Sequence, residues 1–301
     1  MGNSRSGGSF VISLDCELFW GVRDKRTLDE YRTRLLGDRA VVPQLLKIFS
    51  DFDIHATWAF VGFLFFREKK ALLAALPSIK PAYADSGLDP YRVLSDIGSN
   101  EYEDPFHFGF NLIEMVKAVS TQEIATHTFS HLYALESGMS REAIRDDLMT
   151  AVAVAKARGV TIRSLVFPRN QYDDKTLEVL TDVGISCFRG NPKSWLYSAR
   201  NGDDESLFRR ALRLVDAYLP LTGFQSSVFE PSVPANVCAS RFLRPYSLKL
   251  SFLESLKLQR IKGEMTRAAK HDRIYHLWWH PHNFGMQTEE NLSGLRNILE
   301  H

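Results

Sequence analysis

The sequence predicts an α/β protein in which helices cover a parallel sheet. Segments rich in β-branched and aromatic residues alternate with segments whose apolar residues recur at helical spacing, the pattern of repeated strand–helix units. The polar residues best suited to chemistry follow directly on the predicted strands. In α/β barrels the carboxyl ends of the strands and the loops after them build the active site, so this placement favours the same class.

The predicted elements extend along most of the chain. Strands are expected at residues 10–14, 55–61, 123–126, 161–167, 185–188 and 274–279. Helices are expected at residues 40–52, 140–158 and 175–183, and Ser140 and Gly159 are suited to begin and end the second of them. Two longer segments, at about 67–122 and 200–272, interrupt the alternation. We expect them to be insertions in a single domain that spans residues 1–301.

Composition narrows the class of protein. The chain has 301 residues, of which 45% are hydrophobic and 24% charged, so it is long and apolar enough for a well-buried core. A net charge of +1 gives no overall field that favours nucleic acid. The three cysteines are far apart and form no metal-binding or disulfide pattern, which is typical of a reducing compartment. With no signal peptide and no apolar run long enough to span a bilayer, we expect a cytoplasmic protein.

Two histidines four residues apart, His127 and His131, are candidate metal ligands. They follow the strand-like run at 123–126, so two imidazoles can face one cation. A carboxylate from another strand would complete a three-ligand site with an open position. Asp15 and Glu17 end the first predicted strand, where alternation places both on one face and Cys16 on the other. One carboxylate can bind the cation while the other acts as general base. A capping role for one acid, and a core role for one histidine, are the simpler alternatives.

Six segments together resemble the polysaccharide deacetylase family of carbohydrate esterases. They are SLDCE at 13–17, ATWAFVG at 56–62, EIATHTFSH at 123–131, FPRNQY at 167–172, VGI at 183–185 and WHPH at 279–282. Each segment alone is weakly specific, but the ordered set is highly specific and extends from about residue 10 to 285.

The resemblance implies a distorted (β/α) barrel of about seven parallel strands, with helical insertions, and a hydrolase that cleaves an N-acetyl group from an amino sugar. It implies Asp15 as the catalytic base and His127 and His131 as metal ligands, with zinc as the expected divalent metal. It also implies Arg169 as the arginine that orients the base and His280 as the general acid.

The chain departs from the family at one position. The common motif has two adjacent aspartates, the second of which binds the metal, whereas Cys16 stands at that position here. Other members of the wider family resemble this chain in placing the second acid one residue later. We therefore expect Glu17 to be the third ligand, with Cys16 as an alternative. Some relatives, including allantoinase-like members, hydrolyse cyclic amides, so that activity stays open as well.

Four further residues are candidates for contact with the substrate: His282, Trp279, Tyr172 and Trp20. Aromatic rings near the mouth of a site can stack on a sugar, although most rings at such positions belong to the core. His282 has a second interpretation, in which it tunes His280.

The expected substrate is an amino-sugar glycan or a nucleotide-linked or lipid-linked sugar, used in surface polysaccharide synthesis. Residues 241–273 carry nine basic residues against three acidic ones, among them Arg241, Arg244 and Lys249. The simpler explanation of this basic excess is a solvated helix face, and the more specific one is peripheral contact with an anionic membrane surface. Outside the deacetylase interpretation, a non-catalytic glycan-binding relative and a structural metal-binding domain are the alternatives.

Overall fold

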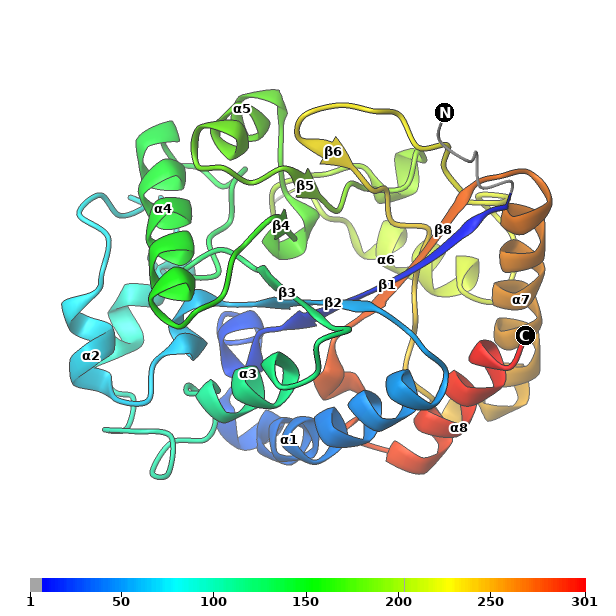
Figure 1. The fold of residues 1–301 in the computed structure, drawn as a ribbon, viewed down its shortest axis with the longest axis horizontal. Helices are drawn as coiled ribbons and strands as arrows, with labels where there is room; N and C mark the ends of the chain where they lie inside the picture. Colours follow the sequence, from blue (N-terminus) through cyan, green and yellow to red (C-terminus); the bar gives the residue numbers. More distant parts are fainter. Residues whose placement is uncertain (1–6, 203) are drawn as a thin grey trace.

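In the part of the chain that the structure describes, the fold is built on one parallel sheet of eight strands. The computed structural model describes residues 7–202 and 204–301. The strands lie in the order β6-β5-β4-β3-β2-β1-β8-β7, and every pair is parallel (Figure 1). Their bounds are β1 (Ser9–Cys16), β2 (Ala56–Phe60), β3 (Glu123–Thr126), β4 (Ser164–Leu165), β5 (Cys187–Phe188), β6 (Ala235–Asn236), β7 (Arg241–Phe242) and β8 (Ile274–Trp279). The sheet curls into a half-barrel with helices outside, which confirms the distorted (β/α) barrel.

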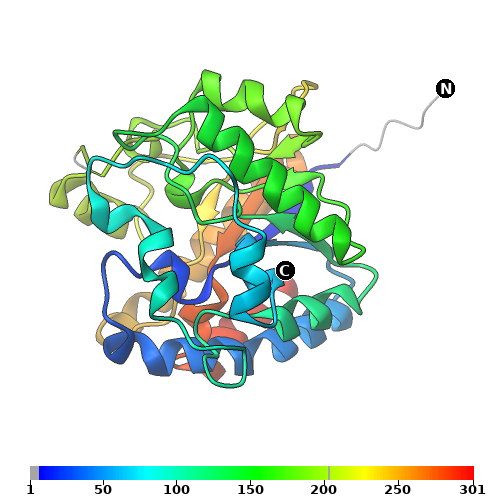
Figure 2. The same ribbon diagram turned by 90° about the vertical axis from the view of Figure 1, so that its left-hand side faces the viewer.

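Helices surround the curled sheet (Figures 1 and 2). They are α1 (Leu28–Asp51), α2 (Lys69–Ala74), α3 (Phe110–Lys117), α4 (Arg141–Ala157), α5 (Asp174–Asp182), α6 (Leu207–Asp216), α7 (Glu254–Lys270) and α8 (Thr288–Leu299). None of the helices in the described residues is long and apolar enough to cross a membrane.

Helix α4 begins where its sequence predicts, because the side chain of Ser140 accepts a hydrogen bond from the backbone N–H of Ala143. Helix α1 begins at Leu28 rather than at residue 40. Thr27 and Glu30 form a capping box that starts it, and its first half has only two buried residues, Leu35 and Asp38, so it carries little apolar periodicity.

The strands differ more from expectation in length than in place. The strand expected at 161–167 is paired only at Ser164–Leu165, and β6 and β7 have two residues each. A two-residue strand leaves no periodic pattern, so β6 and β7 could not be recognised beforehand. Both lie in the segment 200–272, which therefore contributes to the sheet as well as adding helices.

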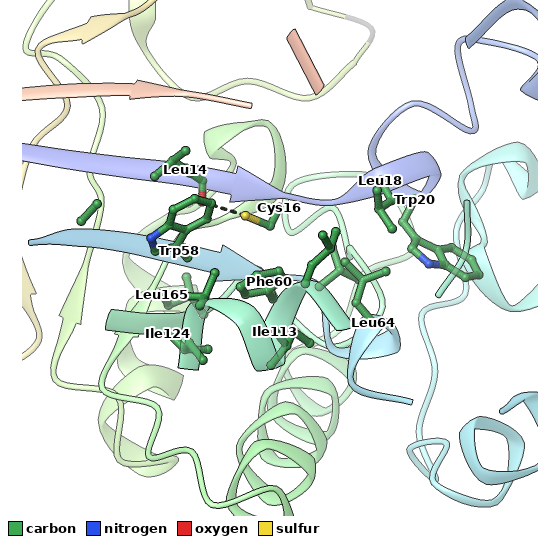
Figure 3. Close-up of a cluster of buried hydrophobic side chains, with 14 of the residues drawn as sticks. Leu14, Cys16, Leu18, Trp20, Trp58, Phe60, Leu64, Ile113, Ile124 and Leu165 are labelled. Carbon is green, nitrogen blue, oxygen red and sulfur yellow. Dashed lines mark hydrogen bonds between the residues drawn. The ribbon is translucent and has the colours of Figure 1, made fainter. Parts of the chain in front are cut away.

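The hydrophobic core lies between the outer face of the sheet and the helices. Leu14 and Cys16 of β1 point into it beside Trp58 and Phe60 of β2, and Ile113 of α3 lies against them (Figure 3). Complete burial of a large apolar side chain is worth about 1.5–3 kcal/mol, so this layer holds the helices on the sheet. The opposite face of β1 carries polar side chains.

Candidate active site and metal centre

Alternation along β1 decides which residues reach the candidate site. Asp15 and Glu17 face the inside of the curled sheet, where they meet basic side chains. Cys16 faces the apolar core, with its Sγ 3.9 Å from the carbonyl oxygen of Leu14 (Figure 3). Burial, and then the negative charge of Asp38, raises the pKa of Cys16 well above its usual value. A cysteine ligand binds a metal as a thiolate, so the geometry and the protonation state of Cys16 both favour Glu17 as the candidate third ligand.

The loop after β3 holds the two histidines in an unusual backbone conformation. Thr128 and His131 have φ angles of 63° and 59°, which are rare for residues with a side chain. Asp147 of α4 fixes this loop, because its carboxylate accepts hydrogen bonds from the backbone N–H of Ser130, at 3.1 Å, and from the Ser130 hydroxyl, at 2.5 Å. Backbone strain of this kind persists where surrounding contacts over-determine it and is frequent at functional sites.

Glu17, His127 and His131 form the candidate metal centre. The Oε2 atom of Glu17 lies 3.0 Å from Nε2 of His131 and 3.4 Å from Nε2 of His127. One ligand atom from each residue lies within 4.8 Å of the others, and all three side chains are buried. His127 Nδ1 lies 2.9 Å from the carbonyl oxygen of Val166, which can accept its proton and leave Nε2 free for a cation. The donor set fits a divalent metal such as zinc.

The protonation states at this centre also fit a metal. Burial raises the pKa of Glu17, but His280, His127 and His131 outweigh it and bring the pKa well below the usual value. Burial lowers the pKa of His131 to about 4, against the opposing pull of Glu17. Metal binding requires a deprotonated carboxylate and a neutral imidazole, which are the forms that these shifts favour.

The arginine that orients Asp15 is Arg189, and the expectation for Arg169 is wrong. Arg189 NH1 lies 2.6 Å from Asp15 Oδ1, and NH2 lies 2.7 Å from Oδ2, a bidentate buried pair. Arg169 instead pairs with Asp24 and lies 3.7 Å from Glu136. With a φ of 54°, Arg169 sits in a tight turn after β4 that directs its side chain away from Asp15.

A sequence signal for Arg189 existed and was missed. Arg189 directly follows the strand predicted at 185–188, so it satisfied the same strand-end rule that selected the other candidates. Burial raises the pKa of Asp15, but Arg189, His127 and His280 together lower it below the usual value.

His280 is the most exposed member of the site. Its Nε2 lies 3.5 Å from Glu17 Oε1 and 3.8 Å from Asp15 Oδ2, and its side chain is 23% exposed. His282 lies behind it, with the two rings stacked at 5.0 Å, and Tyr31 contacts His282 edge-on at 5.5 Å. His282 is buried, and burial together with His280 lowers its pKa to about 3. This arrangement fits the tuning interpretation of His282 and gives it no open surface for a substrate.

The aromatic residues near the site divide into core and rim. Trp20 and Trp279 are completely buried, so the expectation that they contact substrate is wrong. Alternation along β8 turns Trp279 to the outer core and Trp278 to the inside. Trp278 is partly exposed, and its ring centroid lies 5.7 Å from that of His280. Tyr172 is partly exposed too, and its hydroxyl accepts a hydrogen bond from the N–H of Asn191.

Comparisons with known structures show the same fold. A protein described as a polysaccharide deacetylase from Mycobacterium smegmatis is similar at a TM-score of 0.60 and 12% identity, over 99% of this chain and 85% of that one. Puue allantoinase is similar at a TM-score of 0.56 and 11% identity, over 99% and 85%. A 4-alpha-glucanotransferase from Thermococcus litoralis has a TM-score of 0.52 and 11% identity, over 98% and 37%. Identities this low establish the fold alone.

A family model decides the assignment. No curated protein matches the chain. The model described as Polysaccharide deacetylase matches residues 29–188, which is more than half of the 301 residues. This match includes His127 and His131, whereas Asp15, Glu17 and His280 lie outside it and stand on the geometry above. The chain belongs to the polysaccharide deacetylase family, carbohydrate esterases that act on the amide bond of N-acetyl groups.

Proposed function

We propose that this protein is a metal-dependent hydrolase that removes the N-acetyl or another N-acyl group from an amino sugar in a glycan precursor. One observation carries the proposal: a Glu-His-His donor set and an ionised carboxylate meet at the carboxyl ends of the strands. The donor set, Glu17 with His127 and His131, has the chemistry of a zinc site with an open position. Asp15, held by Arg189, supplies the carboxylate.

The proposed mechanism assigns one task to each residue. A divalent cation, when bound, would polarise the acetamide carbonyl and lower the pKa of a water molecule. Asp15 is ionised at neutral pH because Arg189 offsets its burial. Its carboxylate takes a proton from a water molecule while the oxygen of that water bonds to the carbonyl carbon of the N-acyl group. As the C–N bond breaks, His280 gives a proton from Nε2 to the leaving amine nitrogen.

The first experiment measures metal content and acetate release. Protein purified without added metal is expected to contain about one divalent ion per chain, and to release acetate from nucleotide-linked N-acetyl sugars until a chelator is added. Glu17→Gln should lose the metal and the activity, whereas Cys16→Ala, which changes only the core face, should keep both. Acetate release that survives complete removal of the metal would overturn the proposal. Turnover of a cyclic amide such as allantoin instead would favour the allantoinase-like alternative.

The substrate is proposed to be an intracellular precursor of a surface polysaccharide, carried on a nucleotide or a lipid. Three free cysteines support a cytoplasmic location.

Contact with a membrane through residues 241–273 has less support than their charge suggests. Arg241 is buried against Glu264, Lys257 against Glu254, and Arg260 contacts Asp216 at 3.2 Å. These cations are neutralised inside the protein.

Helix α6 is a better candidate for membrane contact than residues 241–273. Its polar residues Arg209 and Asp216 point inward, while its exposed stripe is apolar and consists of Leu207, Phe208, Leu214 and Val215. Arg210 is also exposed. An amphipathic helix that turns its apolar side to solvent beside a cation suits the interface of an anionic bilayer. We therefore propose that α6 carries the peripheral contact and brings the site to a lipid-linked sugar.

Vesicle sedimentation tests this part separately. The protein should sediment with vesicles containing phosphatidylglycerol more than with pure phosphatidylcholine. A Leu207→Asp/Phe208→Asp variant should lose most of that binding and keep its acetate release from soluble nucleotide-linked sugars. Equal sedimentation of the variant and the wild type would exclude α6 as the contact.

A further inference from the structure

We infer that Ser13 and His276 are positioning residues, which hold Arg189 in the orientation in which it binds both oxygens of the Asp15 carboxylate. The inference rests on the proposed function, in which Asp15 is the general base. Arg189 NH1 donates to Asp15 Oδ1 at 2.6 Å and also to the Ser13 hydroxyl at 3.0 Å. The Ser13 hydroxyl in turn lies 2.8 Å from Nε2 of His276. A chain of hydrogen bonds thus connects His276 to Asp15 without direct contact between them.

The chemistry of the groups fixes the direction of every bond in this chain. His276 Nδ1 lies 3.1 Å from the carbonyl oxygen of Val237, which can only accept, so Nδ1 carries the proton. Burial, followed by the nearby charge of Arg189, lowers the pKa of His276 to about 3, and the ring is neutral. Its Nε2 must then accept, so the Ser13 hydroxyl donates to His276 and accepts from Arg189. The Ser13 hydroxyl thus uses its proton for His276 and its oxygen for Arg189.

The environment makes this chain necessary for the position of Arg189. Ser13, Arg189 and His276 are 2%, 3% and 3% exposed, so water does not replace a lost bond. The other anchor of the guanidinium is Asn170, whose Oδ1 accepts from NH2 at 3.0 Å and which is partly exposed. The centroid of the Trp278 ring lies 4.0 Å from the guanidinium carbon of Arg189, but stacking on a ring does not fix the rotation of the guanidinium within its own plane. Among the described residues, Arg189 Nε already has no hydrogen-bond partner.

The chain also lies in regular strands, which makes its geometry stiff. Ser13 is on β1 and His276 on the neighbouring β8, which are paired in parallel over six residues. Both side chains face the inside of the sheet, because side chains alternate along each strand. Arg189 follows β5 on the other side of the curl, so Ser13 bridges across the inside of the half-barrel. Sites supported by strands are held more precisely than sites supported by loops.

Two substitutions of His276 separate a positioning role from a merely structural one. A glutamine amide reaches the place of Nε2 and can accept from Ser13, whereas an asparagine amide reaches the place of Nδ1 and bonds only Val237. Loss of one buried hydrogen bond is worth about 1–1.5 kcal/mol, which corresponds to about a tenfold change in rate. Ser13→Ala and His276→Asn should therefore lower kcat about tenfold, with KM within about twofold, because Asp15 acts in the chemical step.

His276→Gln should keep kcat within about threefold of the wild type. Ser240→Ala is the matched control: its hydroxyl is buried and bonded to the backbone N–H of His276, but it is outside the chain to Arg189. This variant should have the wild-type kcat. Wild-type kcat in Ser13→Ala and His276→Asn, measured on folded protein, would overturn the inference. So would equal losses in His276→Gln and His276→Asn.

A second measurement needs no turnover and keeps the two proposals apart. Absence of acetate release from the wild-type protein would overturn the proposed function. The positioning chain is then judged by a double-mutant cycle in unfolding free energy between His276→Asn and Arg189→Met. These residues share Ser13, so the two losses should be non-additive. Strictly additive losses would show that His276 does not act through Ser13 on Arg189.

Discussion

At the scale of single residues, the ion pair of Asp15 and Arg189 links catalysis to stability. Both side chains are almost completely buried, at 4% and 2% exposed, so neither charge is solvated when its partner is lost. Breaking such a pair by removing one partner is destabilising by about 3–5 kcal/mol. The carboxylate that is proposed to activate water is thus also the counter-ion of a buried cation.

Asp15→Asn is therefore expected to lower the free energy of unfolding by about 3–5 kcal/mol, as well as to abolish activity. Urea denaturation of the variant and the wild type measures the loss. Arg213→Met is the control, because Arg213 and Glu205 form an ion pair that is more than a quarter exposed. Loss of this pair should lower the free energy of unfolding by less than about 1 kcal/mol. An Asp15→Asn variant as stable as the wild type would mean that Arg189 finds another counter-ion.

Gly21 leaves room for the Glu17 carboxylate. A Cβ atom at Gly21 would collide with that carboxylate, while Gly263 in α7 has open space around it. Gly21→Ala should push Glu17 away from His131 and weaken metal affinity by about 10–100-fold, the usual effect of disturbing the support of a ligand. Gly263→Ala should leave metal affinity unchanged. Competition with a chromophoric chelator measures both, and equal affinities would contradict the role assigned to Gly21.

Sequence reasoning located the site residues where backbone periodicity decided the outcome. Alternation predicted Asp15 and Glu17 on one face and Cys16 on the other, and the structure has both carboxylates near His280 and Cys16 in the core. Sequence reasoning wrongly assigned Arg169 to Asp15, because a left-handed turn at Arg169 takes that side chain to Asp24, whereas Arg189 pairs with Asp15. A φ above zero at a residue with a side chain is set by tertiary contacts and leaves no pattern in the sequence.

At the scale of elements, α1 carries an acid in an apolar position. Asp38 is 2% exposed, and its Oδ1 has no hydrogen-bond partner within residues 7–202 and 204–301. Burial, and to a lesser degree the charge of Glu17, raises its pKa from 3.8 to about 7, against the lowering effect of Arg39. Between those two pH values the folded state keeps a proton that the unfolded state has released. Stability is therefore lost as the pH rises from about 4 to about 7.

Asp38→Asn should remove this pH dependence. The free energy of unfolding of the variant, relative to that of the wild type, should rise by on the order of 2–4 kcal/mol from pH 4 to pH 8. Each unit of pKa shift corresponds to about 1.4 kcal/mol. Urea denaturation at pH 4, 6 and 8 gives the two curves. Parallel curves for the two proteins would mean that Asp38 is already ionised in the folded state at low pH.

Elements with long periodic patterns were predictable, and short ones were not. The strand Glu123–Thr126 and helix α4 lie within a residue of their predicted bounds. Strands β6 and β7 are defined only by their pairing with β5 and β8. Pairing partners far apart in the chain cannot be found from a local pattern of two residues.

At the scale of the whole molecule, a bound metal would join parts of the sheet that do not touch directly. Strand β2 lies between β1, which precedes Glu17, and β3, which precedes the two histidines. A ligand that binds only the folded state stabilises it by mass action, by about 2.7 kcal/mol at a hundredfold excess over Kd. For a chain of this size, that corresponds to roughly 5 °C in Tm.

A chelator is therefore expected to lower the Tm by roughly 5 °C, as followed by circular dichroism with and without added zinc. The Tm of Glu17→Gln should not respond to the chelator, since it lacks the third ligand. A shift of the same size in both proteins would locate the stabilising metal elsewhere.

The incomplete closure of the sheet has a consequence for solubility. An open sheet exposes unpaired backbone groups along its two edge strands, which can template the addition of a strand from another molecule. Here the edges are β6 and β7, with two residues each, and the short segment between them bonds to both sides: Ala239 N–H to Gly190 and Ser240 N–H to His276. In the described residues the edge strands are therefore short, which disfavours edge-to-edge pairing although the sheet is not closed into a barrel.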